Sequence, residues 1–167
     1  MSGNVASEKG ELRILGMRLT AIDAQSLCDH LNSLVGVKVS EVIMHNLEFR
    51  LGKLDATRLR TERPGATLND LIEHLRTVDQ LTGVGITTVR SPSNRSEPVE
   101  VEVANPSVKG TEGAGKAFIF SYWAGALTAL LDKELDMKNV VYDKEKDIMR
   151  CLITPRDAVT SKGENAH

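Results

Sequence analysis

Hydrophobic positions in the first half of the chain recur every three or four residues, which is the spacing of helices that bury one face. The first such segment begins after Asp23, whose carboxylate can cap a helix N-terminus, and it ends at Gly36. The second covers about residues 40–59. The third opens at Thr67, with Asp70 at the position that completes a capping box. The pattern therefore predicts three consecutive helices.

Most of the remaining segments alternate between apolar and polar residues, which is typical of strands with one buried face. Val99, Val101 and Val103 alternate with glutamates, and a turn-rich segment at 91–98 precedes them. Together with the β-branched residues before that turn, they predict a hairpin. The predicted strands are 13–22, 86–89, 99–103, 139–142 and 149–153.

An aromatic helix over residues 116–135 is predicted between the two pairs of strands. The element order is therefore β-ααα-ββ-α-ββ, an α+β fold in which an antiparallel sheet is covered by helices. We expect a single domain over residues 11–157. A flexible tail at 1–10 and a disordered tail at 158–167 would flank it, because both are small, polar and charged.

Composition and charge narrow the class of protein. Lysine and arginine total 21 against 23 acidic residues, a net charge of −2, so the chain lacks the basic excess of proteins that bind nucleic acid or anionic membranes. The uncharged stretch 117–131 is shorter than the roughly 20 residues that cross a bilayer, and is typical of a buried helix. The first residues contain no apolar segment of a secretory signal. We therefore expect a soluble, cytoplasmic protein.

The sequence offers no motif for catalysis or for a cofactor. GTEGAGK at 110–116 matches a phosphate-binding loop, but Ala117 stands where such a loop needs Ser or Thr to bind Mg²⁺, so we interpret it as a glycine-rich hinge. The histidines lack metal-binding spacing, and Cys28 and Cys151 lie in apolar patterns. No acidic residue stands alone in an apolar run, which would indicate a raised pKa. We expect no cofactor, no metal and no enzymatic activity.

Four of the six aromatic residues lie between positions 118 and 123, at the start of the aromatic helix. Gly125 and Ala129 continue one face of this cluster as small residues, so this face either lets another backbone approach closely or leaves space beside the rings. Two interpretations are open. The helix is a core element buried on all sides, or it is the wall of a pocket in which Tyr122 and Trp123 orient an apolar guest.

The second half of the chain also carries a loose family motif. It consists of a hairpin, a helix of the pattern F-x-x-G/S-x-x-x-G that ends in a leucine pair, and a closing pair of strands. The matching helix residues are Phe118, Ser121, Gly125, Leu130 and Leu131. Through them the segment 83–153 resembles the vinyl-4-reductase family, small-molecule or hydrocarbon-binding domains distantly related to transport protein particle subunits. The segment 34–56 resembles the first helical hairpin of that family, including Gly36 and Gly52.

Some members of that family bind zinc. The resemblance places the four ligand positions at Lys116, Val140, Asp143 and Cys151, of which only Cys151 could serve. It therefore implies that this chain has no zinc site of the family type.

Members of the family also pair through the early helical hairpin, so the resemblance implies a homodimer. The second predicted helix is compatible with pairing because its apolar surface is wider than one buried face needs; the alternative is a helix buried within its own domain. The apolar residues of this surface are Val42, Ile43, Met44, Leu47, Leu51 and Leu54.

Our leading hypothesis is a non-enzymatic module that binds a small apolar or aromatic molecule in a pocket between the helix at 40–55 and the aromatic helix. The alternative is a dimeric scaffold of the transport-particle kind without a ligand. A reductase acting on a cyclic substrate is a third hypothesis, for which the sequence offers no cofactor site. The expected pocket residues are Phe118, Tyr122, Trp123, Leu127, Met44 and Leu47.

Overall fold

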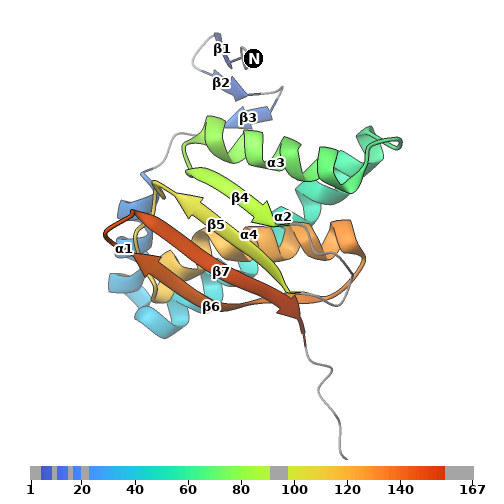
Figure 1. Ribbon diagram of the computed structural model, residues 1–167. Coiled ribbons are helices and arrows are strands. Elements are labelled where there is room, and N and C mark those ends of the chain that lie inside the picture. The colour runs from blue at the N-terminus through green and yellow to red at the C-terminus, as the bar shows by residue number, and fades with distance from the viewer. Residues whose placement is uncertain (1–4, 9–10, 15–16, 20–22, 91–97, 157–167) are drawn as a thin grey trace, which may run out of the picture.

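A four-stranded antiparallel sheet with helices on one face forms the body of the protein (Figure 1). The computed structural model describes residues 5–8, 11–14, 17–19, 23–90 and 98–156. The helices are α1 (Ala24–Val35), α2 (Val37–Glu62), α3 (Leu68–Thr82) and α4 (Gly113–Leu131). The sheet has the order β4-β5-β7-β6, formed by β4 (Ile86–Arg90), β5 (Val99–Ala104), β7 (Ile148–Pro155) and β6 (Leu135–Asp143). The predicted α+β class and single domain are confirmed.

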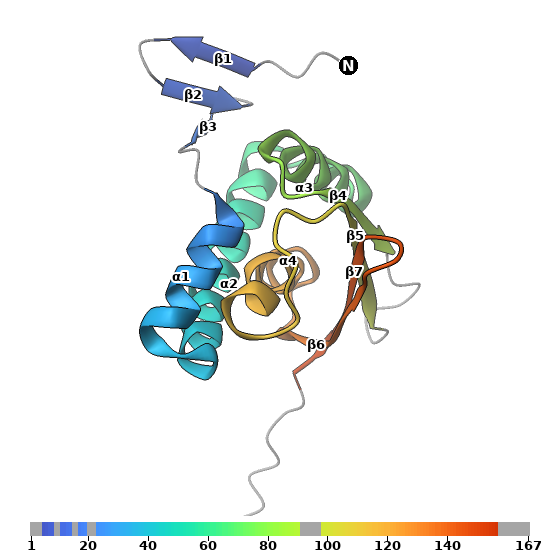
Figure 2. The same ribbon diagram turned by 90° about the vertical axis from the view of Figure 1, so that its left-hand side faces the viewer.

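The central helix of the fold is α4. Figure 2 shows α4 between the α1–α2 pair on one side and the sheet on the other, with α3 beside β4. Phe120, Trp123 and Leu127 are fully buried in this position. Burial on both sides explains why the helix is apolar all round. By length and composition alone α4 could also cross a membrane, but 72% of its apolar window is buried inside the protein.

Two glycines set the crossing of α2 and α4. A Cβ atom at Gly125 would lie 1.9 Å from the carbonyl oxygen of Phe49, and one at Gly52 would lie 2.0 Å from the carbonyl oxygen of Tyr122. The backbones of the two helices therefore touch. Of the two roles open for the small face of the aromatic helix, at Gly125 the structure shows close backbone approach.

The predicted helix caps are confirmed. Asp23 accepts a hydrogen bond from the Ser26 backbone N–H (2.8 Å), and Thr67 and Asp70 form the reciprocal capping box. Gly83 ends α3 in the left-handed conformation that its missing Cβ permits.

The predicted end of the first helix at Gly36 is confirmed, whereas the predicted limits of α2 and α4 were less accurate. At Gly36, with φ of 82°, the chain turns directly from α1 into α2, which begins at Val37 rather than near residue 40. The aromatic helix runs from Gly113 to Leu131 rather than from 116 to 135, because Asp132 adopts a left-handed conformation and ends it. Leu135 instead begins β6, with its N–H donated to the Thr128 hydroxyl.

The strand predicted at 13–22 is wrong in extent. Three short strands, β1 (Val5–Glu8), β2 (Glu11–Ile14) and β3 (Met17–Leu19), form a separate antiparallel sheet. Thus β1 lies within the segment expected to be a tail. The remaining residues of 1–10, residues 15–16 and 20–22, and the tail at 158–167 lie outside the described residues.

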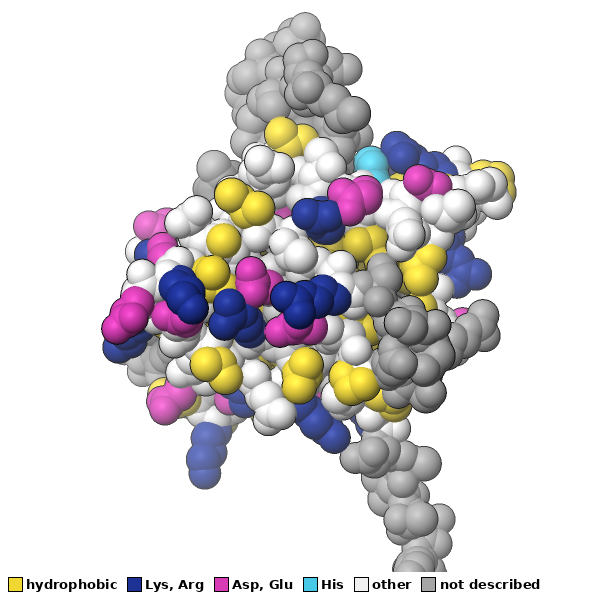
Figure 3. Space-filling model, in the orientation of Figure 1, with side chains coloured by type: hydrophobic (Ala, Val, Ile, Leu, Met, Phe, Trp, Pro, Cys, Tyr) yellow, Lys and Arg dark blue, Asp and Glu magenta, His cyan; other side chains and the backbone are white. Residues whose placement is uncertain are grey.

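The valines of β5 are buried, as their alternation predicts. Val99, Val101 and Val103 face the core, whereas the intervening glutamates lie on the outer face of the sheet, where they pair with arginines. Glu102 binds Arg150 at 2.7 Å and Glu100 binds Arg90 at 2.9 Å. Figure 3 shows this face as a mixture of acidic and basic side chains.

Candidate functional site

A partly enclosed pocket of about 190 Å³ lies between α2, α3 and α4. We call it the inner pocket. Most of its accessible lining is apolar, and three carboxyl groups interrupt that lining. The lining residues are Glu48, Leu51, Asp55, Val78, Asp79, Thr82, Val84, Phe118, Ile119 and Tyr122.

Asp79 is the most deeply buried of the three carboxyl groups, with 5% of its surface exposed. Its Oδ2 accepts hydrogen bonds from the Trp123 indole N–H (2.8 Å) and from the Thr87 hydroxyl (2.7 Å). Burial raises the pKa of Asp79 to about 6, although both hydrogen bonds act in the opposite direction by favouring the carboxylate. Asp79 is thus a lining residue that joins α3 to β4 and α4.

Asp55 and Tyr122 form a second polar contact in the wall. The Tyr122 hydroxyl donates a hydrogen bond to Asp55 Oδ2 at 3.1 Å. Burial raises the pKa of Tyr122 above its usual range, and the negative charge of Asp55 adds to this effect. Both residues also line an adjacent cleft of about 230 Å³, the outer cleft, which includes His74 and Arg63. This hydrogen-bonded pair therefore stands where the two spaces meet.

Glu48 is the third carboxyl group. Burial raises the pKa of Glu48 to about 7, with further contributions from the negative charges of Asp55 and Asp79. Within the described part of the chain, Glu48 forms no hydrogen bond or ion pair. It is therefore the acid in the pocket that remains available to a guest.

The structure brings together only part of the expected pocket. Phe118 and Tyr122 line the inner pocket. Trp123 and Leu127 are fully buried in the core, where Trp123 holds Asp79 from behind. Met44 is buried in a separate cluster, together with Cys28, Val108, Ala114 and Ala117. Leu47 is 52% exposed on the outer surface of α2.

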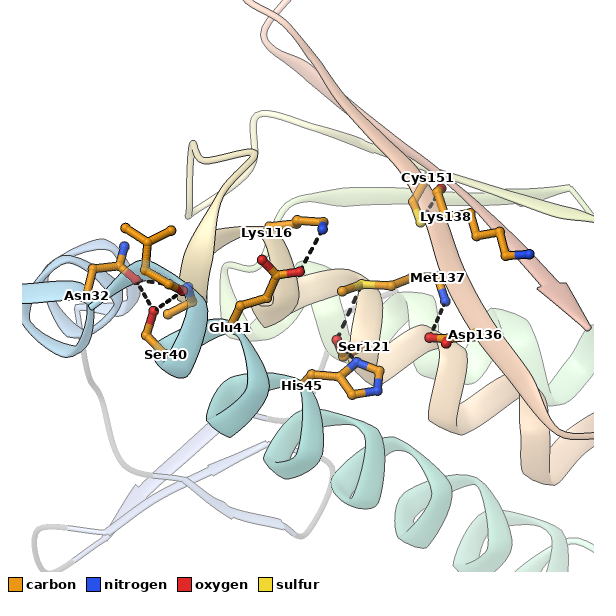
Figure 4. Close-up of polar contacts among 12 residues, drawn as sticks. Asn32, Ser40, Glu41, His45, Lys116, Ser121, Asp136, Met137, Lys138 and Cys151 are labelled. Carbon is orange, nitrogen blue, oxygen red and sulfur yellow. Dashed lines mark hydrogen bonds and ion pairs between the residues drawn. The ribbon is translucent and has the colours of Figure 1, made fainter. Parts of the chain in front are cut away.

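The reason for this difference is that α2 turns its polar side toward α4. Glu41 binds Lys116 at 2.6 Å, His45 Nδ1 lies 2.9 Å from Ser121 Oγ, and Asp55 binds Tyr122. Figure 4 shows the first two of these contacts between α2 and α4. Of the six apolar residues expected to form the pairing surface, all but Met44 are exposed, with exposures of 41–64% at Leu51, Ile43, Leu47, Val42 and Leu54.

Asp79, Glu48 and Asp55 were missed by the sequence analysis, although signals for them exist. Asp79 follows Leu75 by one helical turn and so continues the buried stripe of α3, which makes the statement that no acid stands in an apolar run wrong. Glu48 and Asp55 are seven residues apart and share one face of α2.

The positions that correspond to zinc ligands in the vinyl-4-reductase resemblance do not fit a metal. The Lys116 ammonium is paired with Glu41, and Asp143 accepts backbone hydrogen bonds of its own turn. Cys151 is buried and donates to the Lys138 carbonyl at 3.3 Å, and burial raises its pKa to about 12 (Figure 4). Among the described residues, no three His, Cys, Asp or Glu side chains are grouped as metal ligands.

A larger cleft of about 560 Å³ lies beside the C-terminal end of α4. It is open and mostly polar, and its walls are joined by an exposed Lys53–Glu134 ion pair and by Arg60, which donates to the Ala129 carbonyl. None of the described residues that line it is a buried titratable group comparable to Asp79, so we place the candidate site at the inner pocket.

Comparisons with known proteins identify the fold. Searches for a matching protein family and for a matching curated protein found none. The phenol-responsive sensory domain of the transcription activator PoxR, solved with phenol, is similar in structure, with a TM-score of 0.69 and 16% sequence identity over 92% of this chain and 84% of that domain. Two H-NOX mutants, one of them from T. Tengcongensis, align with TM-scores of 0.44 and 0.43 and 15% identity over 87% of this chain and 80% of theirs. The chain thus shares its fold with the PoxR domain.

Proposed function

We propose that this chain is a non-enzymatic sensory module that binds a small apolar or aromatic molecule in the inner pocket and acts as a homodimer. The observation that carries the proposal is a pocket whose walls are mostly apolar and which contains a small number of placed polar groups. This is the usual composition of a small-molecule site. The motif resemblance to the vinyl-4-reductase family is consistent with it.

The size of the inner pocket supports a guest of one ring. Its volume of about 190 Å³ is slightly larger than the roughly 150 Å³ of an engineered apolar cavity that binds benzene. It is smaller than the roughly 300 Å³ at the lower end for drug-sized ligands. The shared fold adds support, because the similar PoxR domain was solved with phenol. A single substituted aromatic ring is therefore the guest that we favour.

The outward apolar face of α1 and α2 supports the dimer. Large contiguous apolar surfaces on a soluble chain usually mark an interface. The exposed residues are Leu27, Leu34, Val35, Val37, Val39, Val42, Ile43, Leu47, Leu51 and Leu54. The alternative function is a dimeric scaffold without a ligand. The exposed apolar face is compatible with this alternative too, whereas the inner pocket favours ligand binding.

Calorimetric titration of the purified protein with phenol tests the proposal. We expect saturable binding with one site per chain. In Val78→Phe the added ring occupies the inner pocket, and we expect affinity to fall about tenfold or more, since overpacking must be relieved before the guest enters. Val141→Phe makes the same change on β6, where residue 141 is 59% exposed, and should bind like the unaltered protein. A dimer that binds neither phenol nor a related panel of monocyclic aromatics would favour the scaffold.

A further inference from the structure

The inner pocket offers hydrogen-bond acceptors to a guest and keeps its hydroxyl donors engaged. The Tyr122 hydroxyl donates to Asp55, and the Thr82 hydroxyl donates to the carbonyl of Val78 (2.9 Å) or Asp79 (3.1 Å). Both hydrogen bonds to Asp79 reach Oδ2, so its Oδ1 has no partner among the described residues, although the side chain is more than nine-tenths buried. Neither carboxyl oxygen of Glu48 has a hydrogen-bond partner among the described residues.

The charge of the lining also favours a guest that donates hydrogen bonds. Three of the lining residues are acids, and none of the described residues that line the pocket is Lys, Arg or His. Glu48 interacts electrostatically with Asp55 on its own helix, Asp79 on α3, Tyr122 on α4 and Cys28 on α1, and each of these is acidic or neutral. Arg58 acts on Asp55 and is itself bound to Glu62. A buried negative charge without a counter-ion is costly, and a cationic guest offsets that cost.

We propose that the inner pocket selects aromatic molecules that carry a protonated amine, with Glu48 accepting the hydrogen bond of the ammonium group and Phe118, Leu51 and Ile119 packing against the ring. This rests on the proposed function, since it names the ligand class of the same site. Aromatic carboxylates are excluded, because their charge would lie among three acids. Neutral alcohols of the same shape bind more weakly, because their hydrogen bond to Glu48 carries charge on one side only.

Calorimetry with three single-ring probes of similar size tests this selection at pH 8: benzylamine, benzyl alcohol and benzoate. We expect benzylamine to bind about tenfold more tightly than benzyl alcohol. The reason is that both partners of its hydrogen bond to Glu48 are charged, whereas only Glu48 is charged in the hydrogen bond from the alcohol. We expect no binding of benzoate. Glu48→Gln should weaken benzylamine about tenfold and change benzyl alcohol by less than about twofold. Glu73→Gln, the same change at an exposed position of α3, is the control and should alter neither affinity.

A second readout needs no variant. At pH 7 Glu48 is partly protonated, so an ammonium guest lowers its pKa and releases protons, whereas benzyl alcohol releases none. Repeating the titrations in two buffers of different ionisation enthalpy measures this release. Benzyl alcohol binding as tightly as benzylamine would overturn the amine selection and leave the proposed function intact. If phenol and all three probes fail to bind, the proposed function falls as well.

Discussion

At the scale of single residues, two glycines decide how closely α2 approaches α4: Gly52 lies against the Tyr122 carbonyl and Gly125 against the Phe49 carbonyl. Gly125→Ala would improve helix propensity, yet the new Cβ would meet the Phe49 carbonyl at 1.9 Å. We expect a loss of about 3 kcal/mol in the free energy of unfolding, since the backbones must separate. Urea denaturation measures it. Gly65→Ala, where nothing lies within 4 Å of the added atom, is the control and should change stability by about 0.5 kcal/mol or less.

Asp79 gives a second prediction at this scale. In Asp79→Ala the Trp123 indole N–H and the Thr87 hydroxyl lose their buried acceptor. We expect unfolding to become easier by about 3 kcal/mol, because each orphaned donor costs about 1–3 kcal/mol. Asp79→Asn keeps an acceptor oxygen and should lose clearly less. Equal losses in the two variants, measured by chemical denaturation, would show that these hydrogen bonds contribute little.

The third prediction concerns Glu48 and pH. Its pKa is raised from 4.5 to about 7 in the folded protein, so the unfolded chain releases this proton at lower pH than the folded one. The contribution of Glu48 to stability is therefore full below pH 4.5, falls as the pH rises toward 7 and then stays low. Glu48→Gln removes this loss. We expect the variant to be more stable than the unaltered protein by about 2 kcal/mol at pH 8 and by close to nothing at pH 4.5.

Denaturation curves at both pH values test that prediction. A constant difference between Glu48→Gln and the unaltered protein across the range would contradict it.

At the scale of elements, the order of helices and strands in the main body could be predicted because their signals are local. Caps such as Thr67 with Asp70, and the alternation of the β5 valines, depend on neighbours in the sequence. The end of α4 could not be predicted, since Leu135 suits a helix or a strand. The left-handed turn at Asp132 and the hydrogen bond to Thr128 decide for the strand.

The orientation of α2 was also beyond the sequence. The sequence shows that α2 has a polar face and an apolar face. Which of them packs against α4 depends on the side chains that α4 presents to it. Lys116, Ser121 and Tyr122 give partners to the polar face, and Gly125 admits the backbone. For the same reason the pocket residues expected from the apolar face of α2 lie elsewhere, whereas Phe118 and Tyr122, on the aromatic helix, do line the pocket.

At the scale of the whole molecule, the outward apolar face of α2 carries the prediction of a homodimer. Leu54 is 64% exposed in the single chain, and a charge there would be buried in the proposed interface at a cost of a few kcal/mol. We expect light scattering to give the mass of a dimer for the unaltered protein and that of a monomer for Leu54→Glu. Val141→Glu, on the exposed side of β6, should remain dimeric. A monomeric unaltered protein at micromolar concentration would contradict the prediction.

The touching backbones at Gly52 and Gly125 have one further consequence for the inner pocket. Two of its walls, α2 and α4, are held at a fixed separation, so neither can yield when the pocket fills. The third wall, α3, is joined to α4 by the hydrogen bond from Trp123 to the Asp79 side chain, and we expect this wall to yield first. We therefore expect a guest larger than the resting volume to displace α3, and with it the strand β4, whose Thr87 hydroxyl donates to Asp79.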